Sequence, residues 1–422
     1  STLLASSAAS DVYKRQGSWG ELGNQNTSNL YPFYEILPVK SNSGNWLVNG
    51  GKTNTADIPS LVSTLLTWER VRSFNVGFDF GAFSNRLTGS FDYFVRKTVD
   101  MVGPAPQLPL VLGIAPAIVN NADMKSYGFE IELSWRDRIG EVDYGVKFNL
   151  ADAQQKVVKY PNTTNAFSDW YAGKMSGEIW GYTSLGIAKT DEEMKEHLAS
   201  LPNGGQNQLG NKWGAGDIMY ADINGDGKVD GGKGTLADPG DQRIIGNSTP
   251  RYNFGLVLDA SYKGFDVSIF FQGVGKRDYA PIVGTNGAVF WGAVNNIWQS
   301  MAMEEHFDYF RPEGHPMGAN LNGGYPRPDF TSNKNHQVQT RYLQDASYIR
   351  LKNLQIGYTL PKQWINKLHI NRCRVYVSGD NLWTGTSLAS MFDPETLAAG
   401  DWGSGKTYPL SKVISFGLNV NF

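Results

Sequence analysis

The sequence is poor in the residues on which disulfide-stabilised proteins and nucleic-acid-binding proteins depend. It has one cysteine, Cys373, in 422 residues, which excludes an intrachain disulfide framework and a thiolate metal cluster. Charged residues make up 18% of the chain, and the formal net charge of -2 gives no basic surface for nucleic acid. No run approaches the ~18 uninterrupted apolar residues of a membrane-spanning helix. If the chain crosses a bilayer, it must therefore do so as a closed sheet.

Catalytic motifs are also absent from the sequence. It contains no HExxH, no Walker-type phosphate loop, no GxSxG and no paired Cys motif. The histidines are scattered, mostly in segments that we expect to be loops, and we expect each to be an exposed structural residue; they are His197, His306, His315, His336 and His369. We therefore predict that the protein is not an enzyme.

What the chain does contain is strict alternation of large apolar residues with small or polar ones. The carboxy terminus is an example, with apolar side chains at Ile414, Phe416, Leu418, Val420 and Phe422. Because successive residues of a strand point to opposite faces, this pattern gives one apolar face and one face that tolerates water. An outer-membrane β-barrel strand has this pattern and can end on an aromatic residue.

The same alternation predicts nine strands along the chain. They lie at about 74–80, 87–95, 127–135, 142–150, 252–262, 265–271, 346–360, 370–381 and 408–422. The connections near Ala82, Gly140, Gly264 and Trp364 are short, whereas those at about 97–124, 155–248, 277–345 and 382–407 are long. Outer-membrane barrels have short periplasmic turns and long extracellular loops, and this alternation of lengths agrees with that rule.

We therefore predict an all-β fold: an antiparallel transmembrane β-barrel, partial, with about 9–10 carboxy-terminal strands and long extracellular loops. The apolar piece at 179–187 would invert the alternation if it were one barrel strand, so we place it in a folded extracellular insert at 155–248. The alternative is a soluble β-sandwich or propeller, whose strands also alternate because one face packs on a core. The solvent face of such a protein is normally rich in Lys, Glu and Thr, whereas Gly, Ser, Asn and Asp dominate here.

The run DINGDGKVD at 222–230 matches the first nine positions of an EF-hand-type calcium loop. Side-chain oxygens at every second position can surround one hard cation, and a glycine at the sixth position permits the sharp bend. The predicted ligands are Asp222, Asn224, Asp226, the backbone carbonyl of Lys228, and Asp230. Lys233 stands where a closing glutamate is expected, so a carboxylate must come from Asp238 or Asp241 after a glycine-rich insertion. An Asp- and Gly-rich turn without an ion is the alternative.

Five tryptophans fall in segments that we expect to be extracellular, where exposed rings can stack on sugars. These candidate substrate-binding residues are Trp180, Trp213, Trp291, Trp298 and Trp402. Anchoring at a membrane interface or packing within a loop would explain any one of them equally well.

Residues 1–16 match neither the periodicity nor the composition of the remaining chain. We interpret this segment as foreign to the protein, and residues 17–422 as a piece of a longer chain.

Several ordered segments resemble the SusC-like family of TonB-dependent outer-membrane transporters, which includes RagA. They are GNQ at 23–25, LTWE at 66–69, SYGFEIE at 126–132, DINGDGKVD at 222–230, RIIGNSTPRYNFG at 243–255, FDVSIFFQG at 265–273, ASYIRLKNLQIGYTLP at 346–361, VSGDNLWT at 377–384 and FDPET at 392–396. The resemblance covers nearly all of the chain from Gly17 onward.

The resemblance implies a barrel of about twenty-two strands closed by an amino-terminal plug. Such a transporter imports bulky nutrients, either oligosaccharides or peptides, across the outer membrane of a Gram-negative bacterium. A SusD-like surface lipoprotein would act as its lid, and the TonB complex would supply energy through an amino-terminal region that this sequence lacks. The resemblance also implies a structural calcium ion at the 222–230 loop, with Asp241 as the last ligand, and contact of the strands with outer-membrane lipid. The competing function is that of a secreted all-β glycan-binding protein or glycosidase.

Overall fold

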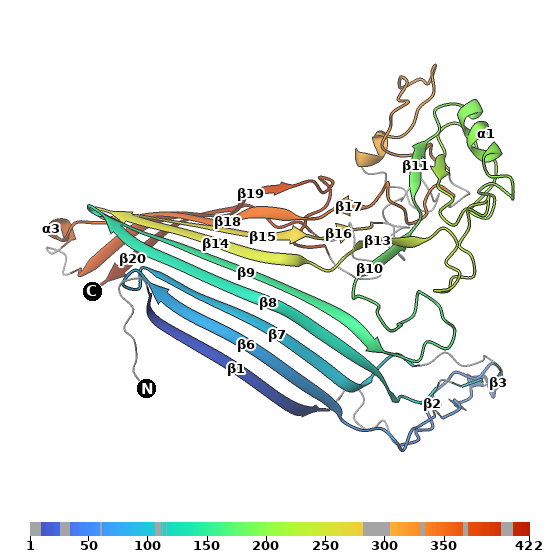
Figure 1. Cartoon of the computed structure of the whole chain (residues 1–422), viewed down its shortest axis with the longest axis horizontal. Coiled ribbons are helices and arrows are strands. Elements are labelled where there is room, and N and C mark those ends of the chain that lie inside the picture. Colours follow the sequence, from blue (N-terminus) through green and yellow to red (C-terminus); the bar gives the residue numbers. More distant parts are fainter. Residues whose placement is uncertain are drawn as a thin grey trace.

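The computed structural model describes residues 10–25, 34–59, 61–105, 111, 113–114, 116–281, 304–329, 334–365, 370–397 and 408–422. Figure 1 shows a large curved sheet with folded loops at one of its ends. None of the helices in these ranges is long and apolar enough to cross a bilayer.

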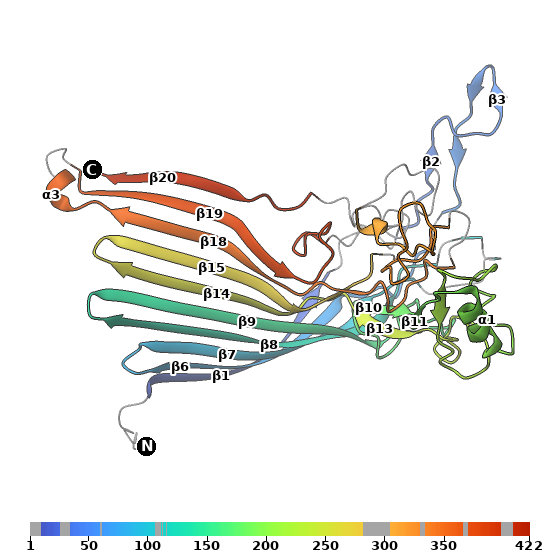
Figure 2. The same ribbon diagram turned by 90° about the horizontal axis from the view of Figure 1, so that it is seen from above.

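Ten antiparallel strands make up the large sheet, in the order β1-β6-β7-β8-β9-β14-β15-β18-β19-β20. Their bounds are β1 (Ser10–Asn24), β6 (Glu69–Ala82), β7 (Leu87–Val102), β8 (Asn120–Ile139), β9 (Val142–Lys159), β14 (Arg251–Tyr262), β15 (Phe265–Lys276), β18 (Tyr348–Thr359), β19 (Arg372–Thr386) and β20 (Val413–Asn421). Strands that follow one another within the sheet are neighbours in space, as in an up-and-down barrel wall (Figure 2). Within the described residues, β1 and β20 each pair on one side only.

The remaining elements are short and lie outside the large sheet. They are β2 (Val39–Lys40), β3 (Leu47–Val48), β4 (Gly51–Lys52), β5 (Thr55–Ala56), β10 (Glu178–Gly181), β11 (Ser184–Ile187), α1 (Asp191–Ala199), β12 (Ile218–Tyr220), β13 (Arg243–Asn247), β16 (Asp278–Tyr279), η3 (Glu304–Phe307), β17 (Gln344–Asp345) and α3 (Lys362–Ile365).

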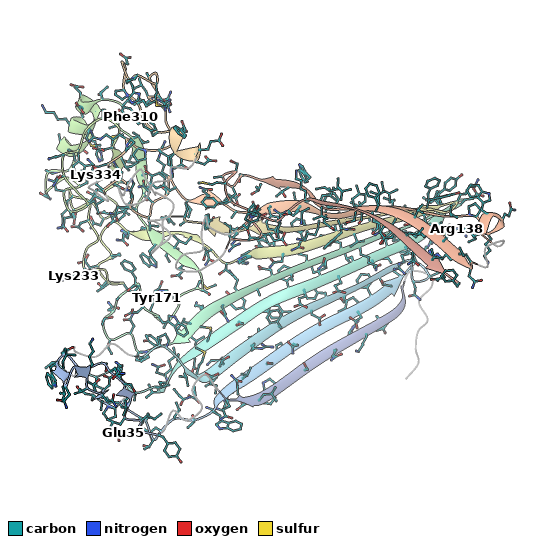
Figure 3. The ribbon with its side chains drawn as sticks, turned by 180° about the vertical axis from the view of Figure 1, so that it is seen from behind. Glu35, Arg138, Tyr171, Lys233, Phe310 and Lys334 are labelled. Atoms are coloured by element: carbon teal, nitrogen blue, oxygen red, sulfur yellow. The ribbon has the colours of Figure 1, made fainter. Side chains whose placement is uncertain are left out.

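The connections sort by length onto the two ends of the sheet. One end, called the turn end here, carries the tight turns, such as the two-residue turn of Lys263 and Gly264, whose φ angles are 46° and 88°. The other, called the loop end, carries β2 to β5, β10 to β13 and α1, whereas β1 begins and β20 ends at the turn end (Figure 1). In Figure 3, Arg138 lies at the turn end, and Phe310 and Lys334 lie at the loop end. The predicted alternation of short and long connections is confirmed.

Cross-strand register gives the sheet one apolar face. Phe78 pairs with Phe91, which pairs with Ile131, and the same row continues through Leu150 and Phe254. Aromatic residues concentrate toward the turn end of this face, where Trp135 lies edge-on to Phe83 and donates to Tyr144 Oη at 3.2 Å; others there are Tyr262, Phe265 and Tyr358. This clustering matches the aromatic girdle of membrane barrels.

One strand was not found by the alternation, although the ten-stranded sheet lies within the predicted range of about 9–10 strands, and the 179–187 segment agrees with the prediction. All nine predicted strands are present, but the sheet has a tenth, β1, which pairs with β6 from Ser10 opposite Ala82 to Asn24 opposite Glu69. Residues 10–16 are therefore part of the sheet, and the foreign origin of residues 1–16 stays a prediction. The segment at 179–187 is not a barrel strand, as expected: it forms β10 and β11, which pair with β13 and β12 in separate two-stranded sheets.

Candidate functional site

The face of the sheet opposite the apolar one is polar over β6 to β9. Asp79 pairs with Ser90, Ser90 with Glu132, and Glu132 with Asn149. Register sets these residues one position away from the apolar row, so they point to the other side of the wall. A wall with this distribution of residues can separate lipid on one side from water and polar solutes on the other.

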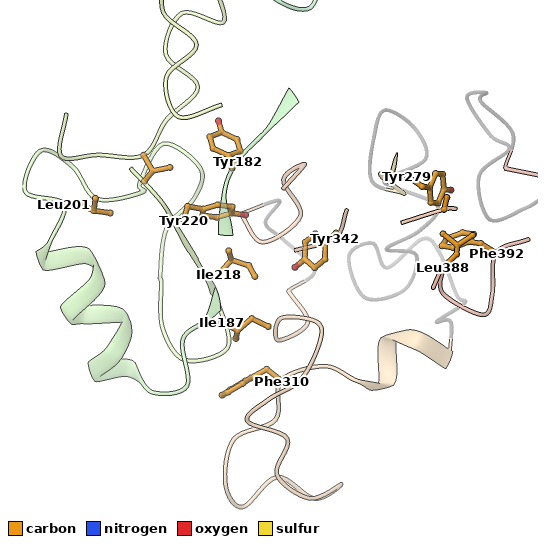
Figure 4. Close-up of a cluster of buried hydrophobic side chains, with 12 residues drawn as sticks. Tyr182, Ile187, Leu201, Ile218, Tyr220, Tyr279, Phe310, Tyr342, Leu388 and Phe392 are labelled. Carbon is orange, nitrogen blue, oxygen red and sulfur yellow. The ribbon is translucent and has the colours of Figure 1, made fainter. Parts of the chain in front are cut away.

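At the loop end, two long connections fold together into one body, which we name the loop unit and which contains residues 160–247, 304–329 and 334–342. Figure 4 shows a hydrophobic cluster at this end, to which Ile218 and Tyr220 contribute from the first connection and Phe310 and Tyr342 from the second; Tyr279, Leu388 and Phe392, outside the loop unit, also belong to it. Tyr220 is fully buried, and its hydroxyl donates to the Lys334 carbonyl oxygen at 2.6 Å. The insert predicted at 155–248 is thus folded, but its core depends on residues about a hundred positions further along the chain.

A buried ionic network fastens the two connections to each other. Asp217 is 0% exposed, and its carboxylate lies 2.8 Å from the ammonium of Lys334, itself 1% exposed. Arg327 donates to both oxygens of the same carboxylate, at 2.8 and 2.7 Å, and Asn335 donates to it at 2.9 Å. Removing either charge of such a buried pair leaves the other without compensation, which makes the network a strong constraint on loop position.

The calcium-type loop has the turn geometry expected from its sequence. Asp222 accepts hydrogen bonds from Gly225 N at 2.6 Å and Gly227 N at 2.8 Å, and both glycines have left-handed φ angles, of 77° and 80°. Asn224 and Asp226 each accept from the backbone N–H two residues further on. This bend at the sixth position is the one that a calcium loop requires.

Asp241, and not Asp238, closes the loop. Its carboxylate accepts from Ile223 N at 2.8 Å and from Asp230 N at 2.8 Å, so it joins the start of the loop to its ninth position. The glycine-rich insertion between Asp230 and Asp241 turns back on itself, with left-handed conformations at Gly232, Gly234 and Gly240.

The charges of the loop are partly compensated by the chain itself. Lys228 forms ion pairs with Asp230 and, at 3.9 Å, with Asp226. Its ammonium, as hydrogen-bond donor to Asp230, lowers the pKa of that buried carboxyl. In the described parts of the chain no three acidic, histidine or cysteine side chains converge as a metal site, so calcium binding stays a prediction.

Two of the five candidate tryptophans are described, and both pack inside the loop unit. Trp180 stacks on Phe167 with ring centroids 4.5 Å apart. The Trp213 ring lies edge-on to Tyr220, and the Lys334 ammonium lies 5.0 Å from its centroid. These contacts account for both residues, so stacking on a sugar stays a prediction. Trp291, Trp298 and Trp402 lie outside the described residues.

The structure offers exposed aromatic side chains that the sequence pattern did not single out. Residues 34–68, between β1 and β6, carry Trp46 at 71% and Trp68 at 63% exposure, together with Leu47 at 65%. Trp46 and Leu47 lie on the small β3–β4 hairpin, which stands away from the large sheet in Figure 2. The sequence did contain a signal for them, since Trp46 and Trp68 lie at the two ends of a segment without the alternation of a strand.

The expectation that every histidine is exposed is wrong for the loop unit. His306 is 3% exposed, and burial lowers its pKa. Burial also lowers the pKa of His336, to about 4. His306 is thus buried and His336 is half-buried, and the lowered pKa keeps both side chains neutral at physiological pH.

The FDPET segment at 392–396 is fixed against the sheet by charge. Arg350 of β18 is 4% exposed and donates to Asp393 at 2.8 Å and to Glu395 at 2.7 Å, and Lys352 reaches the other oxygen of Glu395 at 2.6 Å. These contacts hold the connection after β19 close to the wall.

A two-faced antiparallel sheet with turns at one end and folded loops at the other defines part of a transmembrane β-barrel. The family model described as "TonB dependent receptor-like, beta-barrel" matches residues 10–382. The chain belongs to this family. Since the family consists of receptors and not of enzymes, the prediction that the protein is not an enzyme is confirmed.

Individual relatives agree with that assignment. The chain is 28% identical over 450 residues to TonB-dependent receptor P3 of Formosa agariphila, covering 100% of this chain and 40% of that protein. It is 21% identical over 431 residues to TonB-dependent receptor SusC of Bacteroides thetaiotaomicron, covering 98% of this chain and 38% of that protein. The fold matches the structure of the RagAB peptide transporter with a TM-score of 0.73 and 22% identity, covering 100% of this chain and 42% of that one. This chain thus spans about two fifths of the length of these relatives.

Proposed function

We propose that this chain is the barrel part of a SusC/SusD-type transporter, which imports bulky nutrients across the outer membrane in a TonB-dependent reaction. The observation that carries the proposal is the register of the sheet, which places an unbroken apolar row, from Phe78 through Ile131 to Phe254, on one face. On the other face, the polar side chains from Asp79 to Asn149 line the conduit. In this orientation the turn end is periplasmic and the loop end is extracellular.

The imported nutrient is an oligosaccharide or a peptide. The peptide is supported by the similar RagAB structure, which is that of a peptide transporter, and the oligosaccharide by the resemblance to the SusC-like family. The polar wall has carboxylate, hydroxyl and amide groups that can bond to either class of solute.

Two protein partners complete the transporter. A SusD-like surface lipoprotein covers the extracellular mouth, where the loop unit and the exposed hairpin with Trp46 supply contact surface. The TonB complex engages a part of the receptor that lies outside the residues of this chain. Opening and closing of plug and lid then gate the passage of a solute that is not covalently changed.

A calcium ion held by Asp222, Asn224, Asp226, Asp230 and the Lys228 carbonyl, with Asp241 completing the site, clamps the loop unit. The left-handed glycines and the closure by Asp241 support this assignment. Bound calcium supplies a positive centre that neutralises several carboxylates at once. Its role is structural, because the loop has no flanking helices that could transmit a signal.

Transport is tested with the complete receptor gene expressed together with its neighbouring lipoprotein gene. Fluorescent oligosaccharides and peptides are offered to intact cells with and without a proton uncoupler, and the receptor is located by fractionation. We expect outer-membrane location and uptake that stops with the uncoupler. Uptake that persists without a proton gradient indicates a passive porin, and a freely soluble protein supports the secreted glycan-binding alternative; either result overturns the proposal.

Calcium binding is tested by titrating the purified complete receptor with terbium, which occupies calcium sites and luminesces. Asp222→Asn should weaken terbium binding at least tenfold. Asp238→Asn is the matched control: Asp238 lies in the glycine-rich insertion and does not close the loop, so this variant should bind terbium as wild type does. Equal binding by wild type and Asp222→Asn contradicts the calcium assignment.

A further inference from the structure

A row of positive side chains crosses four neighbouring strands of the sheet. Arg72 of β6 pairs with Lys97 of β7, Lys97 pairs with Lys125 of β8, and Lys125 pairs with Lys156 of β9. We name these four residues the cation row. Directly paired residues share a face and lie ~5 Å apart at Cβ. Like charges at that spacing destabilise a sheet, so the arrangement calls for a negative counterpart.

The cation row lies on the apolar face, directly beyond the apolar residues. The row below it is Trp19, Phe74, Val95 and Tyr127, paired in the same order across β1 to β8. Arg72, Lys97 and Lys125 each lie two positions from this row on their own strands, so they point to the same side of the wall. On β8 the apolar band from Tyr127 to Trp135 is about 27 Å along the strand, or about 21 Å at a 40° tilt.

The apolar band ends where the cation row begins. Its height of about 21 Å is close to the ~25 Å height of the apolar band of outer-membrane barrels. The cations therefore lie at the level of lipid headgroups on the side of the loop end, which is the outer leaflet in the proposed orientation. Lysine and arginine at this depth extend their charged ends to the headgroups while their stems stay along the apolar surface.

The acids of the wall do not balance the row. Glu21 accepts from Arg72 at 2.8 Å, and Asp123 lies 3.3 Å from the Lys97 ammonium. Lys125 lies over the Tyr127 ring at 5.2 Å from the centroid, and Lys156 is exposed. Four positive charges against these two negative ones leave a surplus of two, on a surface that is apolar immediately below the row on β6 to β8.

We propose that the cation row binds a phosphate-bearing lipid of the outer leaflet. Its phosphate lies between Lys97 and Lys125, and its acyl chains lie along the apolar residues below the row, among them Phe74, Val95 and Tyr127. Phosphate satisfies several cations at once through charge-assisted hydrogen bonds. The cations adjoin the apolar band directly, which favours a lipid as the ligand. An acidic protein would instead bind where a polar, solvent-accessible rim surrounds the contact. This inference depends on the proposed function, which sets the orientation of the sheet in the membrane. It adds a lipid that stays bound to the outer surface of the sheet.

The test uses the complete receptor, purified from outer membranes in a mild detergent. Bound phosphorus is measured by lipid extraction, and affinity is measured by titrating delipidated receptor with monophosphoryl lipid A. Variant Lys97→Gln/Lys125→Gln removes two charges from the row. Variant Arg96→Gln/Lys147→Gln is the matched control, since it removes two charges from β7 and β9 on the polar face.

We expect the row variant to bind lipid A about thirtyfold more weakly, since each lysine near an anionic surface contributes about a fivefold factor. The control should bind as wild type does, and Lys97→Arg/Lys125→Arg should keep the affinity, which would show that binding depends on the positive charge. Equal loss in row variant and control, or no loss in either, overturns the proposal.

Three further outcomes are decisive. Displacement of lipid A by millimolar inorganic phosphate alone makes free phosphate the ligand and overturns the lipid assignment. If the row variant loses a co-purifying acidic protein but still binds lipid A, the ligand of the cation row is that protein, and the lipid assignment is likewise overturned. A receptor that fractionates to the outer membrane but shows no charge-dependent lipid binding defeats this inference alone, whereas a soluble receptor defeats the proposed function.

Discussion

Replacing Lys334 by Met removes the positive charge that holds Asp217 inside the loop unit. The two side chains are 1% and 0% exposed, and Lys334 Nζ lies 2.8 Å from Asp217 Oδ2. Arg327 still reaches the carboxylate after the substitution, but the carbonyls of Asn211 and Lys212 lose the ammonium as donor. Removing one partner of a buried pair costs ~3–5 kcal/mol, and because Arg327 remains we expect the lower end, about 3 kcal/mol.

The measurement is hydrogen exchange by mass spectrometry on the complete receptor. Ile218 N donates to the Asn335 side chain and Tyr220 N donates to the Gln206 side chain, so both amides depend on a closed loop unit. A loss of about 3 kcal/mol corresponds to exchange faster by roughly a hundredfold for peptides covering 206–220. Amides in the middle of β8 should not change, because their bonds belong to the sheet.

Lys263→Met is the matched control. Lys263 pairs with Glu141 at 2.8 Å, but the two side chains are 60% and 61% exposed, and such a pair contributes only ~0–1 kcal/mol. If peptides 206–220 exchange equally fast in the Lys334 and Lys263 variants, the buried network does not hold the loop unit, and the assigned role of Lys334 is refuted.

Three other perturbations address the histidines, the calcium-type loop and the orientation of the wall. Burial holds the pKa of His336 at about 4, below the ~6.5 of free imidazole, so its contribution to loop-unit stability is present above about pH 6.5 and is lost as the pH falls toward 4. Proteolysis of the complete receptor should accelerate over that interval and lose most of this dependence in His336→Gln; a profile unchanged by the substitution would contradict the assignment. Gly227→Ala adds a Cβ at φ 80° and 2.9 Å from Asn203 Nδ2, and should destabilise the calcium-type loop by at least ~1–2 kcal/mol, measured as faster exchange of its amides. Ile131→Arg on the apolar face should lower the unfolding free energy in lipid vesicles by ~2–4 kcal/mol and Asn149→Arg on the polar face by much less, so equal costs would mean that the two faces are assigned the wrong way round.

The contrast between β8 and β1 shows what a local pattern can predict. β8 was predicted from Tyr127 to Trp135 because its large apolar residues alternate without a gap. β1 has Trp19 and Leu22 three positions apart among glycines and polar residues, so no period of two is visible. It is a strand because its backbone pairs with β6 along its whole length, and backbone pairing carries no side-chain signal.

The candidate sites divide in the same way. The calcium-type loop was visible in the sequence because its ligands and glycine lie within nine residues. The spacing alone left Asp238 and Asp241 open and only the resemblance pointed to Asp241, since closure of the loop depends on how the insertion turns. Trp213 was selected as a candidate for stacking on sugars, and its packing against Tyr220 and Lys334 is a tertiary contact that the sequence pattern did not show.

By itself, the sequence determined the two-faced strands, their antiparallel hairpins and the ends at which turns and loops lie, because each depends on residues close together in the chain. Only the tertiary structure decided the neighbour of β1, the shared core of Ile218 and Phe310, and the alignment of Arg72, Lys97, Lys125 and Lys156 in one row. Each of these joins residues that are far apart in the chain, and although a tight turn sets the register within one hairpin, the register between hairpins joined by long connections is not specified by any single segment of sequence.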